Sequence, residues 1–149
     1  MINFKNMQTQ IYTDGSCLDN PGGASGWCCY IIEKDNHWII SDGEESSTNN
    51  RMELTAVNEA LDFAQDPTGA YTIYTDSKLT LNCATGVWRR KANLDLWEIF
   101  DRVSQDKVLE WIWVKAHNGN PYNEIVDKIA KSEAIKIQKI KNKKNNIVV

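Results

Sequence analysis

The sequence predicts an α/β fold with one five-stranded mixed sheet flanked by helices, in the element order βββαβαβα. Three observations support this fold class. Short apolar runs of strand length recur along the chain, turns rich in Gly, Pro and Asn separate them, and longer segments keep apolar residues at helical spacing. At 149 residues, with 42% hydrophobic and 25% charged residues, the chain fits one compact domain.

The first half of the chain is expected to form three strands, over residues 8–13, 26–33 and 37–41, and a helix that opens at residue 49. The first strand ends abruptly at Asp14-Gly15-Ser16, and a loop marked by Gly and Pro follows at residues 19–23. The second and third strands form a hairpin about residues 34–36. The helix keeps apolar residues at helical spacing and is closed by the Asp-Pro-Thr-Gly segment at 66–69.

The second half is expected to form a strand over 71–75, a short helix, a helix over 94–103, a strand over 108–114 and a last helix from about 123 to 140. Asn93 is suited to cap the helix that follows it. Residues 141–149 are rich in Lys and Asn, so we expect them to be frayed. The chain therefore divides into a domain over residues 1–140 and a basic tail over 141–149.

The net charge of −3 hides an asymmetry between the two parts of the chain. Residues 1–127 hold ten basic and nineteen acidic side chains, a net charge of −9, whereas residues 128–149 hold seven and one, a net charge of +6. An acidic body is not typical of a protein that coats DNA in general. If nucleic acid is the partner, the tail must supply attraction, and a bound metal ion would offset the acidic body.

The sequence also bears on the compartment of the protein. No apolar run approaches the roughly 18 residues of a membrane span, and the N-terminus lacks the apolar core of a signal peptide. The four cysteines form no Cys-x-x-Cys pair and have no His at zinc-finger spacing. We therefore expect a cytoplasmic monomer without membrane contact, disulfide or structural zinc.

The tripeptide Tyr-Thr-Asp occurs at the ends of two predicted strands and places Asp14 and Asp76 in equivalent positions. If these strands are adjacent and parallel, both carboxylates project from the same sheet edge, where open α/β sheets bind ligands. Neighbouring strands lie about 4.8 Å apart, so two ionised carboxylates there would repel each other unless one is protonated or a cation binds. The alternative is that each aspartate only caps the turn that follows it.

Two further acidic residues begin predicted helices. Glu53 lies in the first turn of its helix, where the helix dipole favours a carboxylate, and follows a polar Asn-Asn-Arg run. Asp127 lies in the first turn of the last helix, soon after a loop that contains His117. Glu53 has the alternative of being only a helix-start residue, but the polar run before it argues for a site. A single histidine between a strand end and a loop rich in Gly and Asn is, taken alone, better explained as a surface residue.

Four segments closely resemble the motifs of type 1 ribonuclease H and occur in the order of that family: 13–22 (TDGSCLDNPG), 48–54 (TNNRMEL), 75–77 (TDS) and 117–127 (HNGNPYNEIVD). The resemblance spans residues 8 to about 135. It implies an endonuclease that cuts the RNA strand of an RNA–DNA hybrid and leaves a 5′-phosphate and a 3′-hydroxyl.

By this resemblance, Asp14, Glu53, Asp76 and Asp127 would ligate two Mg²⁺ ions, with Mn²⁺ also possible, since the cluster offers only hard oxygen ligands. The ions would lie about 3.5–4 Å apart. One, on Asp14 and Asp127, would activate water, and the other, on Asp14, Glu53 and Asp76, would stabilise the leaving oxygen. His117 matches a mobile-loop histidine that assists proton transfer or product release.

The resemblance also implies residues that bind the substrate. The RNA 2′-hydroxyl, which distinguishes RNA from DNA, would be contacted by backbone amides of Gly15, Ser16 and Cys17 and by Asn20, Asn49, Glu53 and Lys78. At Lys78 the family more often has glutamine. Thr48 and Asn20 would hold a DNA phosphate, and Asn50 lines the same surface. Asn20 also has a simpler explanation as an ordinary turn former, an explanation that fits the Thr-Asn-Asn run less well.

Many relatives insert a long basic handle where this chain has only residues 86–93. Trp88 and the neighbouring Arg89, Arg90 and Lys91 would pack against a DNA sugar and contact phosphates there. The alternative is that Trp88 belongs to the core and the cations form a solvated face. The lysine-rich end of the chain is a second candidate cationic surface, and its alternative is an ordinary solvated helix end; it contains Lys136, Lys139, Lys141, Lys143 and Lys144.

Three other functions fit part of the pattern. The same fold with a carboxylate cluster serves Holliday-junction resolvases and integrases, although the Thr-Asn-Asn-Arg-Met-Glu run argues against them. A module that binds hybrids without cutting them would need a defect that the sequence does not reveal. A two-carboxylate glycosidase would explain neither the third and fourth acids nor the basic tail.

Overall fold

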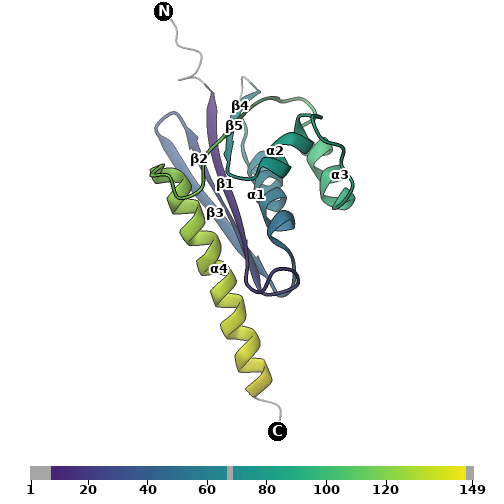
Figure 1. Cartoon of the computed structure of the whole chain (residues 1–149). Coiled ribbons are helices and arrows are strands. Elements are labelled where there is room, and N and C mark those ends of the chain that lie inside the picture. Colours follow the sequence, from purple (N-terminus) through teal and green to yellow (C-terminus); the bar gives the residue numbers. More distant parts are fainter. Residues whose placement is uncertain (1–7, 67–68, 147–149) are drawn as a thin grey trace, which may run out of the picture.

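The computed structural model describes residues 8–66 and 69–146. Its five-stranded mixed sheet has the order β3-β2-β1-β4-β5, with helices on both faces (Figure 1). The elements are β1 Thr9–Cys17, β2 Ser25–Glu33, β3 Asn36–Glu44, α1 Asn49–Phe63, β4 Ala70–Thr75, α2 Lys78–Ala84, α3 Leu94–Val103, β5 Val108–Trp113 and α4 Pro121–Asn146. The predicted fold class is confirmed, and the expected short helix makes the full order βββαβααβα.

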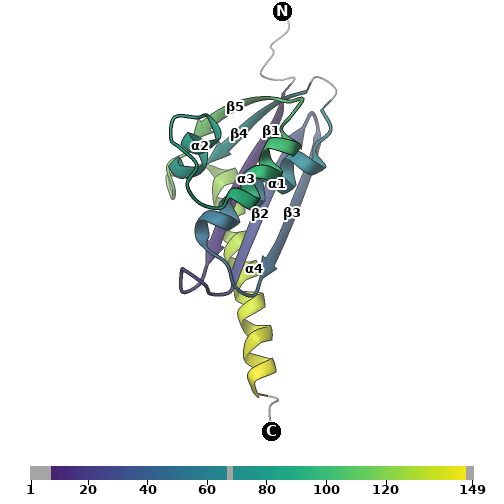
Figure 2. The same ribbon diagram turned by 90° about the vertical axis from the view of Figure 1, so that its right-hand side faces the viewer.

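Alternating side chains of β1 separate two apolar clusters, one on each face of the sheet. Ile11 belongs to the larger cluster, which α1 and α3 cover, whereas Tyr12 belongs to a smaller cluster against α4. Figures 1 and 2 show α1 and α3 on one side of the strands and α4 on the other. This arrangement follows from the period-2 alternation of strand side chains.

Strand β1 runs four residues beyond its predicted end at residue 13, to Cys17. Its parallel pairing with β4 ends at Tyr12 opposite Tyr74, whereas its antiparallel pairing with β2 continues to Cys17 opposite Ser25. The predicted end of this strand at Thr13 is therefore wrong, because β2 holds the next four residues in extended conformation. Asp14 consequently projects from a paired strand and not from a turn.

Helix α4 is longer at both ends than the sequence predicts. It begins at Pro121, so Asp127 lies in its second turn and not in its first, and it continues to Asn146. Residues 141–146 are thus helical and not frayed, while 147–149 lie outside the described residues. Lys141 donates to the Glu45 carbonyl oxygen at 2.9 Å, and Lys144 lies 3.0 Å from the Glu45 carboxylate. These two contacts tie the end of α4 to the loop after β3.

A glycine on β2 allows α4 to lie close to the sheet. A Cβ atom at Gly26 would lie 2.3 Å from the carbonyl oxygen of Ala130, which no real side chain tolerates. Ala130 and Ala134, fully buried on the facing side of α4, keep this contact short. The close packing fixes the position of Asp127, one turn earlier in the helix.

The expected cap of α3 has a different role. Asn93 precedes Leu94 as predicted, but its φ of 56° is left-handed and its side chain makes no capping hydrogen bond. Instead, its Oδ1 accepts a hydrogen bond from the Arg51 guanidinium at 3.2 Å. Arg51 also forms a two-point ion pair with Asp95, at 2.7 and 3.0 Å. The start of α3 is therefore tied to the start of α1.

Two further structural facts bear on the class of protein. Within the described ranges, no helix combines the length and the apolar character that a membrane crossing requires. Cys17, Cys28, Cys29 and Cys83 carry free thiols.

Candidate active site

The two Tyr-Thr-Asp tripeptides place Asp14 and Asp76 side by side. Strands β1 and β4 are adjacent and parallel, as the prediction required, with Tyr12 opposite Tyr74. Each aspartate follows its tyrosine by two residues, just past the last pair of the parallel ladder. Asp14 is buried, with 3% of its surface exposed, and its carboxylate accepts the Gly15 amide at 2.9 Å.

Glu53 reaches the two aspartates from α1. It is the fifth residue of that helix, so it lies in the second turn and not in the first turn as predicted, and it is buried. A Cβ atom at Gly15 would lie 2.4 Å from the Glu53 nitrogen and 2.5 Å from the Met52 carbonyl carbon. Only glycine at this position lets α1 approach β1 closely enough to bring Glu53 to the sheet edge.

Asp14, Glu53 and Asp76 together have the geometry of a cation site. One ligand oxygen from each lies within 4.8 Å of the other two. The Glu53 Oε2 atom is buried and has no hydrogen-bond partner, which is costly unless a ligand completes the site. An all-carboxylate donor set suits hard cations such as Mg²⁺. The residues therefore fit the metal that the sequence resemblance implies.

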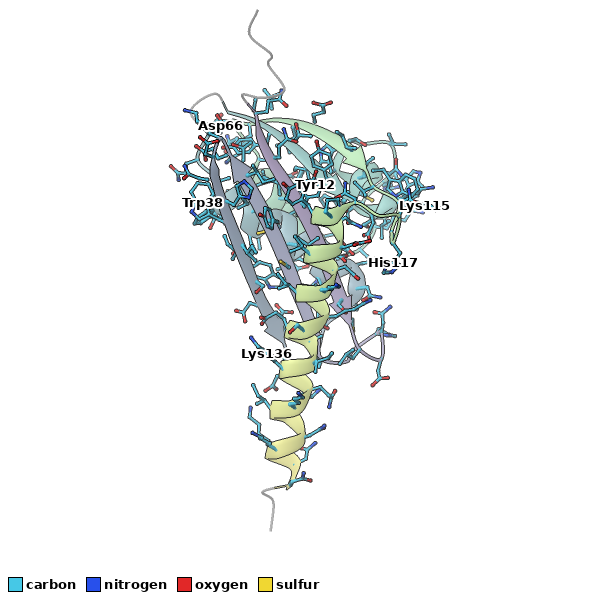
Figure 3. The ribbon with its side chains drawn as sticks, turned by 90° about the vertical axis from the view of Figure 1, so that its left-hand side faces the viewer. Tyr12, Trp38, Asp66, Lys115, His117 and Lys136 are labelled. Atoms are coloured by element: carbon cyan, nitrogen blue, oxygen red, sulfur yellow. The ribbon has the colours of Figure 1, made fainter. Side chains whose placement is uncertain are left out.

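Asp127 and His117 face the same carboxylates across an open hollow of about 500 Å³. The hollow is lined by Asp14, Gly15, Ser16, Cys17, Asn49, Asn50, Glu53, Asp76, Ser77, Ala116, His117, Asp127 and Lys131. His117 lies on the loop that leads into α4 (Figure 3), and its Nδ1 lies 4.0 Å from the Asp127 carboxylate. Asp127 lines the hollow but is not part of the closely spaced triad.

The carboxylates disfavour one another's ionisation. Burial raises the pKa of Asp14 from 3.8 to about 7, with a further contribution from the charge of Asp76. Burial, followed by the charge of Asp14, raises the pKa of Glu53 well above its ordinary value. Burial and the charge of Asp127 raise the pKa of Asp76. A divalent cation would relieve this repulsion by allowing all three groups to ionise.

The predicted substrate-binding residues divide into two groups. Gly15, Ser16, Cys17, Asn49 and Asn50 line the hollow beside the carboxylates, whereas Asn20, Thr48, Lys78 and Trp88 do not. The side chain of Asn20 accepts the Asn49 amide at 3.1 Å, and the Thr48 hydroxyl caps α1 by accepting the Arg51 amide at 3.1 Å. These bonds fit the simpler turn-forming explanation and also orient the polar run next to the hollow.

Lys78 and Trp88 lie on exposed surfaces outside the hollow. The Lys78 ammonium lies 4.5 Å from the centre of the Trp113 ring, and Trp113 donates its indole N–H to the Asp76 carbonyl oxygen at 3.2 Å. Trp88 is 47% exposed, so the interpretation of Trp88 as a core residue is wrong. Arg90, one of its basic neighbours, pairs with Asp101 at 2.9 Å and covers the Trp97 ring.

Sequence reasoning missed Lys131 as a residue of the hollow. Its ammonium lies 3.4 Å from the Asp127 carboxylate, one helical turn away. The spacing of four residues was the available signal, since such pairs share a helix face. Trp113 and Arg51 were also missed as supports of Asp76 and of the α1–α3 contact, because both act through distant segments.

Substitution of Gly15 by alanine tests the contact between α1 and β1. We expect Gly15→Ala to lower the free energy of unfolding by about 1–3 kcal/mol, because the added methyl group overlaps α1 backbone, and to lower activity by displacing Glu53. Urea denaturation would measure the first effect. Ser16→Ala, which adds no atoms at the neighbouring position, is the control, and equal stability of the two variants would contradict the account.

Comparisons with known proteins agree with this geometry. The family model for ribonuclease H matches residues 6–135. A Ribonuclease H of Neorickettsia sennetsu is 41% identical over 138 residues, covering 83% of this chain and 91% of the relative. A Ribonuclease H of Helicobacter acinonychis is 42% identical over 137 residues, covering 87% and 94%.

Solved structures show the same fold. LC9-RNase H1, a type 1 RNase H with the type 2 active-site motif, has a TM-score of 0.72 at 26% identity, covering 85% of this chain and 72% of the other. LC11-RNase H1 in complex with an RNA/DNA hybrid has a TM-score of 0.68 at 23% identity, covering 84% and 98%. With the family model spanning most of its length and relatives above 40% identity, the chain belongs to the ribonuclease H family.

Proposed function

We propose that this chain is an endonuclease that hydrolyses the RNA strand of RNA–DNA hybrids and leaves 5′-phosphate and 3′-hydroxyl ends. The observation that carries the proposal is the convergence of Asp14, Glu53 and Asp76 within 4.8 Å, with Asp127 in the same hollow. Membership of the ribonuclease H family supports the reaction class. A hybrid is also the ligand in the complex of LC11-RNase H1, which shares the fold.

The four carboxylates are proposed to hold two Mg²⁺ ions, or Mn²⁺ in their place. Asp14, Glu53 and Asp76 would hold one ion, and Asp14 and Asp127 the other. Bound ions of this kind lower the pKa of water and stabilise charge on a phosphoryl group. The chain itself contributes the rigid placement of its ligands, since Asp14 projects from a paired strand and Glu53 from a buried helix face.

Binding of the hybrid is proposed to use the polar residues at the rim of the hollow. The backbone of Gly15, Ser16 and Cys17, with Asn49, would lie against the RNA strand and its 2′-hydroxyls, the groups that separate RNA from DNA. Asn20 supports this rim through its bond to the Asn49 amide. Thr48 and Asn50 would face the DNA strand. Contacts by Lys78 and Trp88, which lie outside the hollow, stay predictions.

His117 is proposed to move a proton or assist product release. Its side chain is 69% exposed on a loop, and its Nδ1 lies 4.0 Å from the Asp127 carboxylate, so the imidazole is accessible to a substrate in the hollow. We expect His117→Ala to lower kcat roughly tenfold to a hundredfold, less than the loss of a carboxylate. The control is His37→Ala, whose Nδ1 instead pairs with the Tyr30 hydroxyl at 2.6 Å. Equal rates for the two variants would rule out the role.

The deciding experiment incubates the purified protein with end-labelled hybrid, single-stranded RNA, double-stranded RNA and junction DNA, with Mg²⁺ and with EDTA. We expect Mg²⁺-dependent cuts in the RNA strand of the hybrid alone. Cleavage of the junction would favour a resolvase, and hybrid binding without turnover would favour a non-cutting module. The monomeric state and cytoplasmic location expected from the sequence stay predictions.

A further inference from the structure

The side of α4 that faces away from the sheet carries a row of lysines. The row, called here the lysine stripe, consists of Lys128, Lys131, Lys136, Lys139 and Lys143. Spacings of three to five residues place these side chains on one side of the helix, and all five are exposed. The opposite side is apolar, because Val126, Ala130 and Ala134 are fully buried.

The stripe keeps most of its positive charge. Lys131 pairs with Asp127 at 3.4 Å and Lys136 with Glu133 at 3.1 Å. In the part of the chain that the structure describes, Lys128, Lys139 and Lys143 form no ion pair with a carboxylate. On a body with a net charge of −9 over residues 1–127, this concentration of unpaired cations is available to a partner of opposite charge.

The stripe is continuous with the carboxylate hollow and leads away from it. Lys131 lines the hollow, and the twelve residues from there to Lys143 rise about 18 Å along the helix axis. Figure 2 shows α4 continuing beyond the ends of the strands, and Figure 3 shows it continuing well past Lys136. At about 3.4 Å per nucleotide, this length matches roughly five phosphates of one strand.

The projecting part of α4 is held in place from its other side. Lys141 donates to the Glu45 carbonyl oxygen, and the Lys144 ammonium lies 3.0 Å from the Glu45 carboxylate. The ammonium of Lys144, with the charge of Lys141, lowers the pKa of Glu45. Glu45 lies in the short segment between β3 and the Thr48-Asn49-Asn50 run. The segment that leads into the polar rim of the hollow therefore also holds the helix that carries the stripe.

We propose that the lysine stripe binds the phosphate backbone of the nucleic acid that occupies the hollow and extends the contact along α4. The inference rests on the proposed function. Ammonium groups attract phosphates regardless of base or sugar, so the stripe contributes affinity and not discrimination between hybrid and duplex DNA. This helix supplies the positive charge that the acidic body lacks for binding a polyanionic substrate.

The test compares K139Q/K143Q with K34Q/K107Q, which removes the same charge outside α4. Glutamine keeps the helix propensity of lysine. With Asp14→Asn added to prevent cleavage, the dissociation constant of a 24-base-pair hybrid is measured by fluorescence anisotropy from 50 to 200 mM salt. We expect K139Q/K143Q to weaken binding about tenfold near 100 mM salt and to reduce the salt slope by about 2. Duplex DNA should lose affinity by the same factor.

Steady-state kinetics of the same two double variants, with Asp14 intact, should show a raised KM and an unchanged kcat for K139Q/K143Q, because these lysines lie away from the reacting phosphate. Equal affinities and salt slopes for the two double variants would overturn the inference, and an acidic protein partner would then be sought for the stripe. Failure of the wild-type protein to cut hybrid would overturn the proposed function instead, while the anisotropy comparison would still decide the role of the stripe.

Discussion

Asp14→Asn is expected to lower the rate of hybrid cleavage in Mg²⁺ by about a thousandfold or more, which corresponds to several kcal/mol of transition-state stabilisation. Asp14 belongs to the carboxylate triad within 4.8 Å and is the ligand that both proposed ions share. The amide keeps the size of the side chain but removes the charge that attracts a divalent cation. Single-turnover cleavage of a labelled hybrid measures the effect, and Asp76→Asn should behave in the same way.

Asp62→Asn is the matched control, since Asp62 is an exposed carboxylate on α1 away from the hollow. It should leave both activity and stability unchanged. In EDTA, Asp14→Asn should be at least as stable as the wild-type protein, because it relieves repulsion among buried carboxylates. Cleavage by Asp14→Asn within tenfold of wild type, or a clear loss of its metal-free stability, would contradict the assignment of Asp14 as a metal ligand.

The free energy of unfolding of the metal-free protein is expected to fall as the pH rises from about 4 to about 7. Burial, with the charge of Asp76, raises the pKa of Asp14 in the folded state from 3.8 to about 7. The folded protein therefore binds more protons than the unfolded chain in this range, and stability decreases with pH. Asp14 alone contributes a decrease of about 4 kcal/mol, and the raised pKa values of Glu53 and Asp76 act in the same direction.

Urea denaturation at pH 5, 6, 7 and 8, in EDTA and in Mg²⁺, measures this dependence. Mg²⁺ should recover most of the lost stability at pH 7 and 8, since bound cations favour the ionised carboxylates. The difference in unfolding free energy between wild type and Asp14→Asn, both in EDTA, should grow with pH, whereas Asp62→Asn should follow the wild type. A constant difference across the series would show that the pKa of Asp14 is not raised.

Local sequence patterns predicted most of the elements but misplaced some of their ends. The end of β1 was misplaced because Gly15 and Ser16 are turn formers by type, yet β2 pairs with both of them. The end of α4 was misplaced because its last turns are held by Glu45, a residue almost a hundred positions earlier in the chain. In each case a contact with a distant segment outweighs the local preference.

The residue types of the candidate site were predictable for a different reason. Asp14 and Asp76 end the same Tyr-Thr-Asp tripeptide on two strands, and parallel pairing of those strands necessarily brings both carboxylates to one edge of the sheet. Trp113 carries no such signal, since it reaches the Asp76 carbonyl oxygen only once β5 has paired with β4. Lys131 is related to Asp127 by its four-residue spacing, but it reaches the hollow only once α4 has packed on the sheet. The functional roles of the site residues stay predictions until the variants are measured.

The sequence by itself determined which strands and helices form, because periodicity and turn chemistry act over a few residues, and its motifs indicated the four carboxylates through their resemblance to a family. Only the tertiary structure decided how deeply those carboxylates are buried, since Glu53 reaches Asp14 through the space left by the missing side chain of Gly15. It also decided that the lysine stripe of α4 faces away from the sheet and meets the hollow at Lys131. Burial and charge repulsion depend on atoms from segments far apart in the chain, and no local pattern encodes those distances.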